Sequence, residues 1–388
     1  MNKKFTVIDL FSGCGGLSEG FMQTEKFEFV AHVEWELPMI NTLRENLTAR
    51  WNYTKEHSEE SVIRFDIQKT EELMHGNWTN ETRKQYISDN AAFVADHGID
   101  GLLQGKKVDV IIGGPPCQAY SIAGRAQDSN SMRNDYRNYL FESFVKVVDC
   151  YKPEVFVFEN VPGILSATPG GKHVIDRICE AFNEIGYDIR SPFAMNKSIY
   201  SANDFEVPQQ RRRIIIFGVR KGASFGVEEL YKNLDLEKCT DKKLTVADAI
   251  KGLPKYRPIS KPYKVGARNY SYELVGNVNL PYHVARYNNK RDIDVFKKWL
   301  EGDMNQLPNQ DKLEFYQQVS GKKTNHNKYR SLEWDKPSPT IVSHLYKDGL
   351  MFIHPDKEQL RTITVLEASL LQSFPKEYRF IGSTAYCY

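Results

Sequence analysis

Short apolar runs rich in β-branched residues recur through the first 220 residues, and each run is followed by glycines or a polar side chain. Runs of about four to eight such residues, bounded by breakers, are typical of buried strands. Stretches with apolar residues on one helical face, such as 139–151 and 173–185, lie between the later runs. Alternating strands and helices predict an α/β fold built on a doubly wound, mostly parallel sheet.

Five features follow the predicted strands directly, and most of them carry reactive or hydrogen-bonding groups. The carboxyl ends of parallel strands share one edge of a doubly wound sheet, and ligands bind at that edge. We therefore expect these features to meet in a single crevice, which is the arrangement of an enzyme. They are the glycine loop after residues 5–10, Glu34, Asp66, Cys117 and Glu159.

The glycine loop Phe-Ser-Gly-Cys-Gly-Gly after the first strand is typical of nucleotide cofactor binding. A dinucleotide fingerprint would need a further glycine where the chain has Ser18. The pattern therefore argues against NAD and fits the looser loop that binds S-adenosylmethionine. Glu34, at the end of the second strand, can accept hydrogen bonds from ribose hydroxyls, and Trp35 can stack on adenine. Asp66 is a candidate acceptor for the adenine amino group.

Residues 251–330 are basic, whereas the rest of the chain is mildly acidic. This segment holds 16 Lys and Arg against 7 Asp and Glu, which leaves 36 against 43 elsewhere. Aromatic residues are interleaved with these cations, and few long periodic runs occur in 221–335. We interpret 221–335 as a second, smaller, loop-rich domain that contacts nucleic acid. A charged face that is merely solvated is the alternative interpretation.

The sequence thus predicts a first domain at 1–220, a second domain at 221–335 and a returning segment at 336–388, in which periodic patterning resumes. The returning segment contains an amphipathic helix that starts near Thr364. Thr364 is the predicted N-cap of this helix, and Glu367 is its partner in a capping box.

The composition excludes several classes of protein. No apolar run approaches the roughly 20 residues of a membrane span, and Asp9 interrupts the first apolar run too early for a signal peptide. The six cysteines form no CxxC pair, which argues against a structural zinc site and favours reduced thiols. We therefore expect a cytoplasmic, nucleoid-associated protein that binds no metal and no membrane.

The segment Gly-Gly-Pro-Pro-Cys-Gln around Cys117 resembles the nucleophile loop of the DNA (cytosine-5) methyltransferases of bacterial restriction–modification systems. A lone cysteine is usually a small buried hydrophobe, but here the other motifs of the family occur in order along the chain. The resemblance covers nearly the whole chain outside 221–335, the region where the family has its target-recognition domain. It implies that 1–220 is the catalytic domain and that the returning segment 336–388 supports the recognition domain. The other matching segments are 9–16, Glu159-Asn160-Val161, Gln209-x-Arg211-x-Arg213, Arg361-x-x-Thr364-x-x-Glu367 and Gln372-x-Phe374-Pro375.

This resemblance implies the S-adenosylmethionine-dependent methyltransferase fold and methyl transfer to C5 of a cytosine in a specific double-stranded DNA sequence. S-adenosylmethionine would be the methyl donor, and methylation would protect host DNA from a cognate restriction endonuclease. The target base lies inside a duplex, so it must be flipped out. The residues that the family pattern assigns to the cofactor are Phe11, Gly13, Gly15, Glu34, Trp35, Asp66, Ile67, Pro116 and Leu140.

The catalytic residues that the resemblance implies are Cys117, Glu159, Arg211 and Arg213. Cytosine C5 is too weak a nucleophile to take a sulfonium methyl group unaided, so the Cys117 thiolate adds to C6 and activates C5. Glu159 is the candidate donor at ring N3, provided that its site keeps a proton on it. Arg211 and Arg213 are candidates to stabilise charge on the ring oxygen and the phosphate.

Two other functions stay open on the sequence alone. The tRNA-methylating branch of the family shares the catalytic motifs, and a DNA-binding module without catalysis would explain the end of the chain. The family normally closes with a Gly-Asn motif and a helix that pack against the cofactor loop, and the chain reaches Tyr388 without them. Either the chain was cut short or a second polypeptide supplies this part.

Overall fold

An eight-stranded sheet lies at the centre of the first of two units into which the chain divides. The computed structural model describes residues 3–116, 140–239, 242–342, 345–347 and 349–387. The first unit comprises Met1–Tyr200 and Arg212–Lys238, and the second comprises Ser201–Arg211 and Cys239–Tyr388. The second unit therefore includes most of the two segments that the sequence separates at residue 335. A recognition role for 221–335 stays a prediction.

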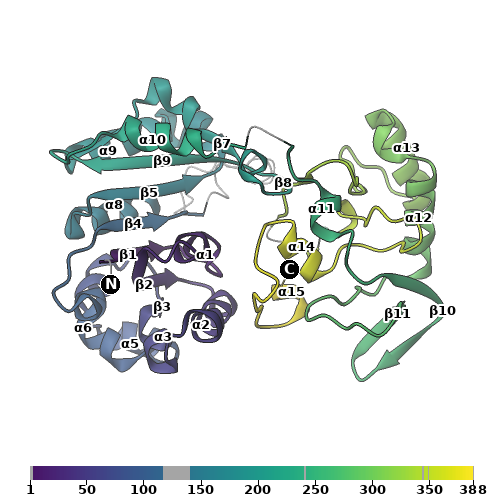
Figure 1. Ribbon diagram of the computed structural model, residues 1–388, viewed down its shortest axis with the longest axis horizontal. Helices are drawn as coiled ribbons and strands as arrows, with labels where there is room; N and C mark the ends of the chain where they lie inside the picture. Colours follow the sequence, from purple (N-terminus) through teal and green to yellow (C-terminus); the bar gives the residue numbers. More distant parts are fainter. Residues whose placement is uncertain (1–2, 117–139, 240–241, 343–344, 348, 388) are drawn as a thin grey trace. The chain divides into compact units, whose positions relative to one another are not determined.

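The strands of the sheet lie in the order β3-β2-β1-β4-β5-β9-β6, with β7 paired to β9 (Figure 1). β1 pairs in parallel with both β2 and β4, so the strand order reverses at β1, where doubly wound folds bind ligands. β9 runs antiparallel between β5 and β6. The predicted doubly wound, mostly parallel sheet is confirmed. The strands are β1 (Phe5–Leu10), β2 (Phe27–Glu34), β3 (Val62–Arg64), β4 (Val110–Gly113), β5 (Val155–Asn160), β6 (Tyr187–Ile189), β7 (Ile199–Ser201) and β9 (Arg212–Arg220).

Helices cover both faces of this sheet, because successive side chains of each strand point to opposite faces. Val7 and Ile112 pack in one apolar core with residues of α1 and α2, whereas Ile8 and Ile111 pack in another with residues of α6, α8 and α9. The polar stretch 68–107 forms the crossover from β3 to β4 and contributes to the second of these cores. The helices are α1 (Gly16–Met22), α2 (Leu37–Trp51), α3 (Lys55–Ser61), α4 (Thr70–His75), α5 (Asn80–Tyr86), α6 (Ala92–Leu103), α8 (Leu140–Tyr151), α9 (Val174–Glu184) and α10 (Val227–Leu236).

The second unit holds more regular structure than its loop-rich sequence predicts. α12 and α13 are helices of 12 residues each, and β10 pairs with β11 in an antiparallel hairpin. The signal for α12 was present: Asn289 caps its start, and Val295, Phe296, Trp299 and Leu300 form a buried stripe at helical spacing. The elements are β8 (Gln209–Gln210), α11 (Val246–Ile250), β10 (Tyr256–Val265), β11 (Arg268–Leu274), α12 (Lys290–Glu301), α13 (Asn309–Ser320), β12 (Ser338–Pro339), α14 (Val365–Leu370) and α15 (Thr384–Cys387).

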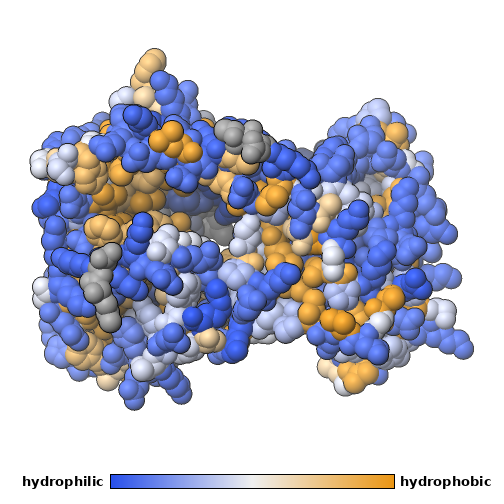
Figure 2. Space-filling view, viewed as in Figure 1, coloured by the Kyte–Doolittle hydropathy of each residue, from blue (hydrophilic) through white to orange (hydrophobic). Residues whose placement is uncertain are grey.

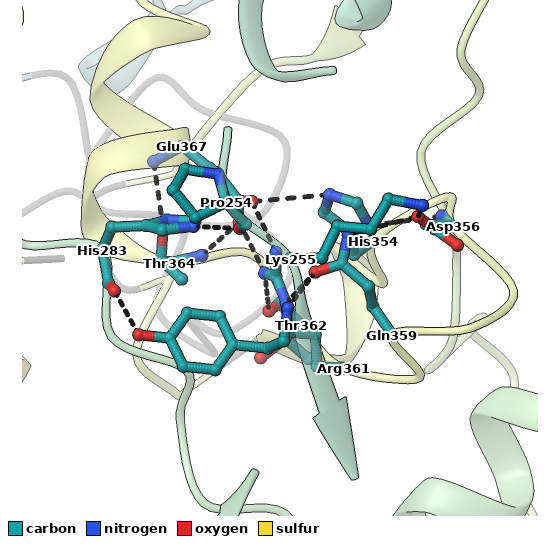
Figure 3. A network of polar contacts seen from close by, with 11 residues as sticks. Pro254, Lys255, His283, His354, Asp356, Gln359, Arg361, Thr362, Thr364 and Glu367 are labelled. Carbon is teal, nitrogen blue, oxygen red and sulfur yellow. Dashed lines mark hydrogen bonds and ion pairs between the residues drawn. The ribbon is translucent and has the colours of Figure 1, made fainter. Parts of the chain in front are cut away.

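A buried ion pair organises the start of α14 (Figure 3). Arg361 donates from Nη1 and Nη2 to the two carboxylate oxygens of Glu367, each at 2.6 Å. Glu367 and Thr364 also form the predicted capping box, which is confirmed. Burial alone would raise the pKa of Glu367, but the charges of Arg361 and His354 outweigh it and hold that pKa well below its usual range.

The same network connects α14 to the hairpin. Arg361 Nε donates to Gln359 Oε1 at 2.9 Å, and that oxygen also accepts from the backbone N–H of Tyr256, the first residue of β10. His283 contacts Thr364, with Nδ1 3.0 Å from Oγ1.

Figure 2 shows that the visible surface over α12 and α13 is mostly hydrophilic. No helix within the described ranges is long and apolar enough to cross a membrane.

Candidate active site

A cavity of about 570 Å³ lies in the first unit, beyond the carboxyl ends of β1, β2, β3 and β4. Its size is in the range of small-molecule sites, which run from about 300 to 1,000 Å³. Seven of the nine predicted cofactor residues are in its wall: Phe11, Glu34, Trp35, Asp66, Ile67, Pro116 and Leu140.

The two remaining cofactor candidates, Gly13 and Gly15, shape the loop rather than line the cavity. Both have positive φ, 56° and 89°, and Gly15 is the N-cap of α1. Phe11 also has a positive φ of 59°, which costs strain for a residue with a bulky side chain. The strained turn carries the Phe11 side chain into the wall of the cavity.

Glu34 joins the glycine loop to the end of β2. Its Oε2 accepts from the Gly13 N–H at 2.7 Å, and its Oε1 accepts from the N–H groups of Trp35 and Glu36 at 2.8 and 2.9 Å. Burial raises the pKa of the Glu34 carboxyl, and these backbone donors partly oppose that rise. A carboxylate oxygen can accept two hydrogen bonds, so Oε2 keeps capacity for a ligand hydroxyl.

Asp66 and Trp35 keep polar and aromatic surface available to a ligand. Asp66 Oδ1 accepts from the Gln68 N–H at 3.0 Å, and no other side-chain hydrogen bond to Asp66 occurs among the residues that the structure describes. Trp35 is 49 % exposed. Its ring meets the Tyr86 ring edge-on, with an angle of 71° between the two ring planes. These groups fit the predicted adenosine contacts, whose assignment stays a prediction.

Glu159 and Arg213 form an ion pair, with Arg213 Nε 2.6 Å from Glu159 Oε1. Glu159 lies opposite Ile215 in the antiparallel pair of β5 and β9, so Arg213 is its diagonal neighbour on the same face. A Cβ at Gly114 would lie 3.0 Å from Glu159 Oε2, so the absence of a side chain there leaves room for the carboxylate. The sequence placed both residues in the site but did not predict that they pair.

Asn160 is a residue whose role the sequence did not reveal beyond its place in the Glu-Asn-Val motif. It is 2 % exposed, and its Nδ2 donates to the Pro115 carbonyl at 3.3 Å. Its Oδ1 accepts from the Val161 N–H at 2.9 Å. Asn160 therefore fixes the backbone two residues before Cys117.

The remaining predicted catalytic residues are less fully described. Cys117 lies outside the described residues. Arg211 belongs to the second unit, where its N–H donates to the Gln209 carbonyl at 3.0 Å and its carbonyl accepts from the Ala202 N–H at 2.9 Å. Within the described part of the chain, no group of three or more His, Cys, Asp or Glu side chains is placed to hold a metal ion.

Comparison with known proteins assigns the chain to a family. The family described as C-5 cytosine-specific DNA methylase matches residues 5–388. The type II methyltransferase M.Bpa9945I of Bacillus paralicheniformis is 33 % identical over 97 % of this chain and 92 % of its own length. The type II methyltransferase M.DdeI of Desulfomicrobium norvegicum is 30 % identical over 97 % of this chain and 80 % of its own length.

The fold is also similar to solved structures. A prophage-encoded E. coli protein described as a DNA modification methyltransferase superposes with a TM-score of 0.57 at 22 % identity, over 97 % of this chain and 90 % of that one. At this identity the likeness concerns the fold alone. The match across residues 5–388 shows that the chain belongs to the C-5 cytosine-specific DNA methylase family.

Proposed function

We propose that this chain transfers a methyl group from S-adenosylmethionine to C5 of a flipped-out cytosine in a specific double-stranded DNA sequence, through covalent addition of Cys117 to C6. The chain is a DNA cytosine-5 methyltransferase by family, and its relatives are type II methyltransferases of restriction–modification systems. The observation that carries the finer proposal is the cavity with seven predicted cofactor residues in its wall.

The cavity suits the adenosine and methionine parts of the cofactor. Glu34 would accept from the ribose hydroxyls, Asp66 would accept from the adenine amino group, and Trp35 would cover the ring. Leu140 and Phe11 supply apolar wall. S-adenosylmethionine would supply a methyl group made electrophilic by a positively charged sulfur.

The remaining chemistry belongs to the protein and the base. The Cys117 thiolate forms a bond to C6, and the displaced electron pair makes C5 nucleophilic. Glu159 is proposed to act at N3. Since its pair with Arg213 is that of a carboxylate, Glu159 must take up a proton before it can donate a hydrogen bond to N3 as charge develops. Arg213 occupies Oε1, so Oε2, on the Gly114 side, is the oxygen left for the ring. After C5 is methylated, a base removes its proton, the bond from sulfur to C6 breaks, and the thiolate is restored.

A duplex with 5-fluorocytosine at the target position tests this proposal. A base can remove a proton from C5 but cannot remove fluorine, so the bond between Cys117 and C6 cannot be released. The wild-type protein should form a stable covalent adduct, and Cys117→Ser should form none while it still binds DNA. Absence of an adduct with the wild type on a duplex that it methylates would refute covalent addition.

The tRNA alternative is not favoured, since the matching family is described as a DNA methylase and the curated relatives are type II methyltransferases. Parallel measurements of methyl incorporation into duplex DNA and into tRNA test this directly.

The protective role is tested by methylation-sensitive sequencing of DNA from cells that express the chain, which also reveals the target site. The comparisons do not support the expected second polypeptide, which is not part of the proposal. A cytoplasmic location near the nucleoid follows from a DNA substrate.

A further inference from the structure

The second unit contains a polar cavity of about 150 Å³ that the mechanism above does not use. It is bounded by α12, α13 and the segment that follows α13. Most of its wall residues are partly exposed, so the cavity is open to solvent. The wall comprises Trp299, Asn305, Lys312, Asn327, Tyr329, Arg330, Glu333 and Met351.

Arg330 is the most unusual member of this wall, because its guanidinium is partly buried and no carboxylate of the described residues lies within 4.0 Å of it. The guanidinium makes one hydrogen bond to a described residue, from Nε to the Met351 carbonyl at 3.5 Å. Its Cζ lies 5.7 Å from the centroid of the Phe352 ring. Burial lowers the pKa of the Arg330 guanidinium. A cation that loses water without gaining an anion destabilises the fold, and a bound anion at this cavity would offset that cost.

Other groups around the cavity also have unused hydrogen-bonding capacity. Lys312 donates to the Asn305 carbonyl at 2.8 Å, and its ammonium forms no ion pair with a described residue. The buried Oδ1 of Asn327 has no hydrogen-bond partner among the described residues, and a half-turn of that amide would present Nδ2 instead. Tyr329 is 5 % exposed, and its hydroxyl makes no hydrogen bond to a described residue.

Glu333 is the carboxylate in the wall, and its charge is already offset. It accepts from Gln306 Nε2 at 2.9 Å and from Asn305 Nδ2 at 3.3 Å, and it pairs with Lys336 Nζ at 2.6 Å. Arg330 and Lys312 therefore leave a net positive charge at the cavity. Donors from both cations and an open mouth match a tetrahedral oxyanion.

We propose that this cavity binds one phosphate group of the DNA backbone, held by Arg330 and Lys312. The inference rests on the proposed action on duplex DNA, and it goes further by naming the side chains that would fix the second unit on the DNA backbone. At roughly 30 Å³ per water molecule, the cavity has room for a phosphate group and a few waters. Phosphate contacts of this kind set the register of a protein on DNA without reading its sequence.

The test compares duplex binding by the full chain and by Arg330→Met over a range of salt concentrations. We expect Arg330→Met to weaken binding roughly 10- to 100-fold, since one charge-assisted contact is lost. The slope of log K against log salt should fall in magnitude by about one. Lys297→Gln is the matched control, because it also removes one positive charge from the second unit. Lys297 lies outside the cavity and forms an exposed ion pair with Glu301.

Two further variants separate a ligand role from a structural one. Lys312→Met should weaken duplex binding as well, whereas Glu333→Gln removes a negative charge and should strengthen it a few-fold. A purely structural cluster would make every one of these substitutions harmful, so weaker binding by Glu333→Gln would overturn the proposal. Thermal unfolding of each variant identifies any that fail to fold.

Steady-state methylation distinguishes this inference from the proposed function. Arg330→Met should raise KM for DNA and leave kcat at saturating DNA unchanged, whereas a wild-type chain inactive on DNA would refute the proposed function instead. Inorganic phosphate is the second probe. Stabilisation of the wild type by free phosphate, combined with unchanged duplex affinity in Arg330→Met, would show a free-anion site and would overturn the assignment to DNA.

Discussion

Arg213 Nε lies 2.6 Å from Glu159 Oε1, across the antiparallel pair formed by β9 and β5. This relationship exists because β9 is the reversed strand of the sheet, which brings the first residues of β9 beside the last residues of β5. The candidate proton donor of the reaction therefore has a cation bound to one of its two oxygens. The pair restricts how Glu159 can be oriented toward a base.

The first prediction concerns Arg213→Met, which leaves Glu159 without its partner. We expect the rate constant of methyl transfer to fall about 100-fold, the cost of losing one group that orients or stabilises charge in an active site. Affinity for S-adenosylmethionine should stay unchanged. Arg213→Lys, which keeps the charge but not the Nε geometry, should recover part of the rate. Single-turnover methylation at saturating DNA is the measurement, and wild-type rates in Arg213→Met would contradict the role given to this pair.

The second prediction concerns the space beside Glu159. Alanine at Gly114 would place Cβ 3.0 Å from Oε2, so the carboxylate must shift. We expect Gly114→Ala to slow methyl transfer about 10- to 100-fold while the protein stays folded, because small displacements of a catalytic group are costly. Gly20→Ala is the control, since an added Cβ there meets no atom within 4 Å. Equal rates for the two variants would show that Glu159 does not depend on this space.

Much of the first unit could be predicted from the sequence. The strands were recognisable as apolar runs, and their sharing of one edge follows from the geometry of parallel sheets, which is why seven cofactor candidates lie in one cavity wall. The pairing of Glu159 with Arg213 was not predictable, because it depends on β9 running antiparallel beside β5. That neighbour relation joins segments more than 50 residues apart and leaves no local pattern.

The second unit shows a different limit. The stripe Val295, Phe296, Trp299 and Leu300 has helical spacing, but the many polar residues around it mask the pattern in a segment that otherwise predicts loops. The state of Arg330 has no signal in the sequence, where it looks like any other surface cation of the basic segment. Among the described residues no carboxylate pairs with Arg330, which lies where α12 and α13 pack with residues 327–333, an arrangement that only a tertiary structure reveals.

The third prediction concerns the pH dependence of cofactor binding. Burial raises the pKa of Glu34, so this carboxylate takes up a proton at a higher pH than an exposed one as the solution is acidified. Once protonated, Glu34 accepts less well from Gly13 and from the ribose hydroxyls. Affinity for S-adenosylmethionine should therefore fall as pH falls through this raised pKa. Calorimetric titration between pH 8 and pH 5 measures it, with Glu34→Gln expected to bind about tenfold more weakly and with little pH dependence. Identical pH profiles for the two proteins would exclude Glu34 as the titrating group.

The buried network of the second unit also responds to pH, and two histidines determine the direction. Burial lowers the pKa of His354, which contacts Glu367, and that of His283, which contacts Thr364 and the Pro254 carbonyl (Figure 3). The unfolded chain binds protons at these histidines near the usual pKa of 6.5, whereas the folded chain binds them at a lower pH. Below about pH 6.5 the unfolded state thus holds more protons, and stability falls as pH falls.

The fourth prediction follows from this difference. Each histidine should remove up to about 1.4 kcal/mol of stability per pH unit below 6.5, until the folded protein also takes up the proton. Glu367 titrates at lower pH because its own pKa is depressed, so its contribution is still intact in this range. Hydrogen exchange at the amides of His354 and Ile363, which bond to the carbonyls of Arg361 and Phe352, reports this region directly. After correction for the intrinsic exchange rate, protection at these amides should decline between pH 7 and pH 5.5. His354→Gln, which cannot titrate, should show a shallower decline, and pH-independent protection in the wild type would rule out both histidines as the cause.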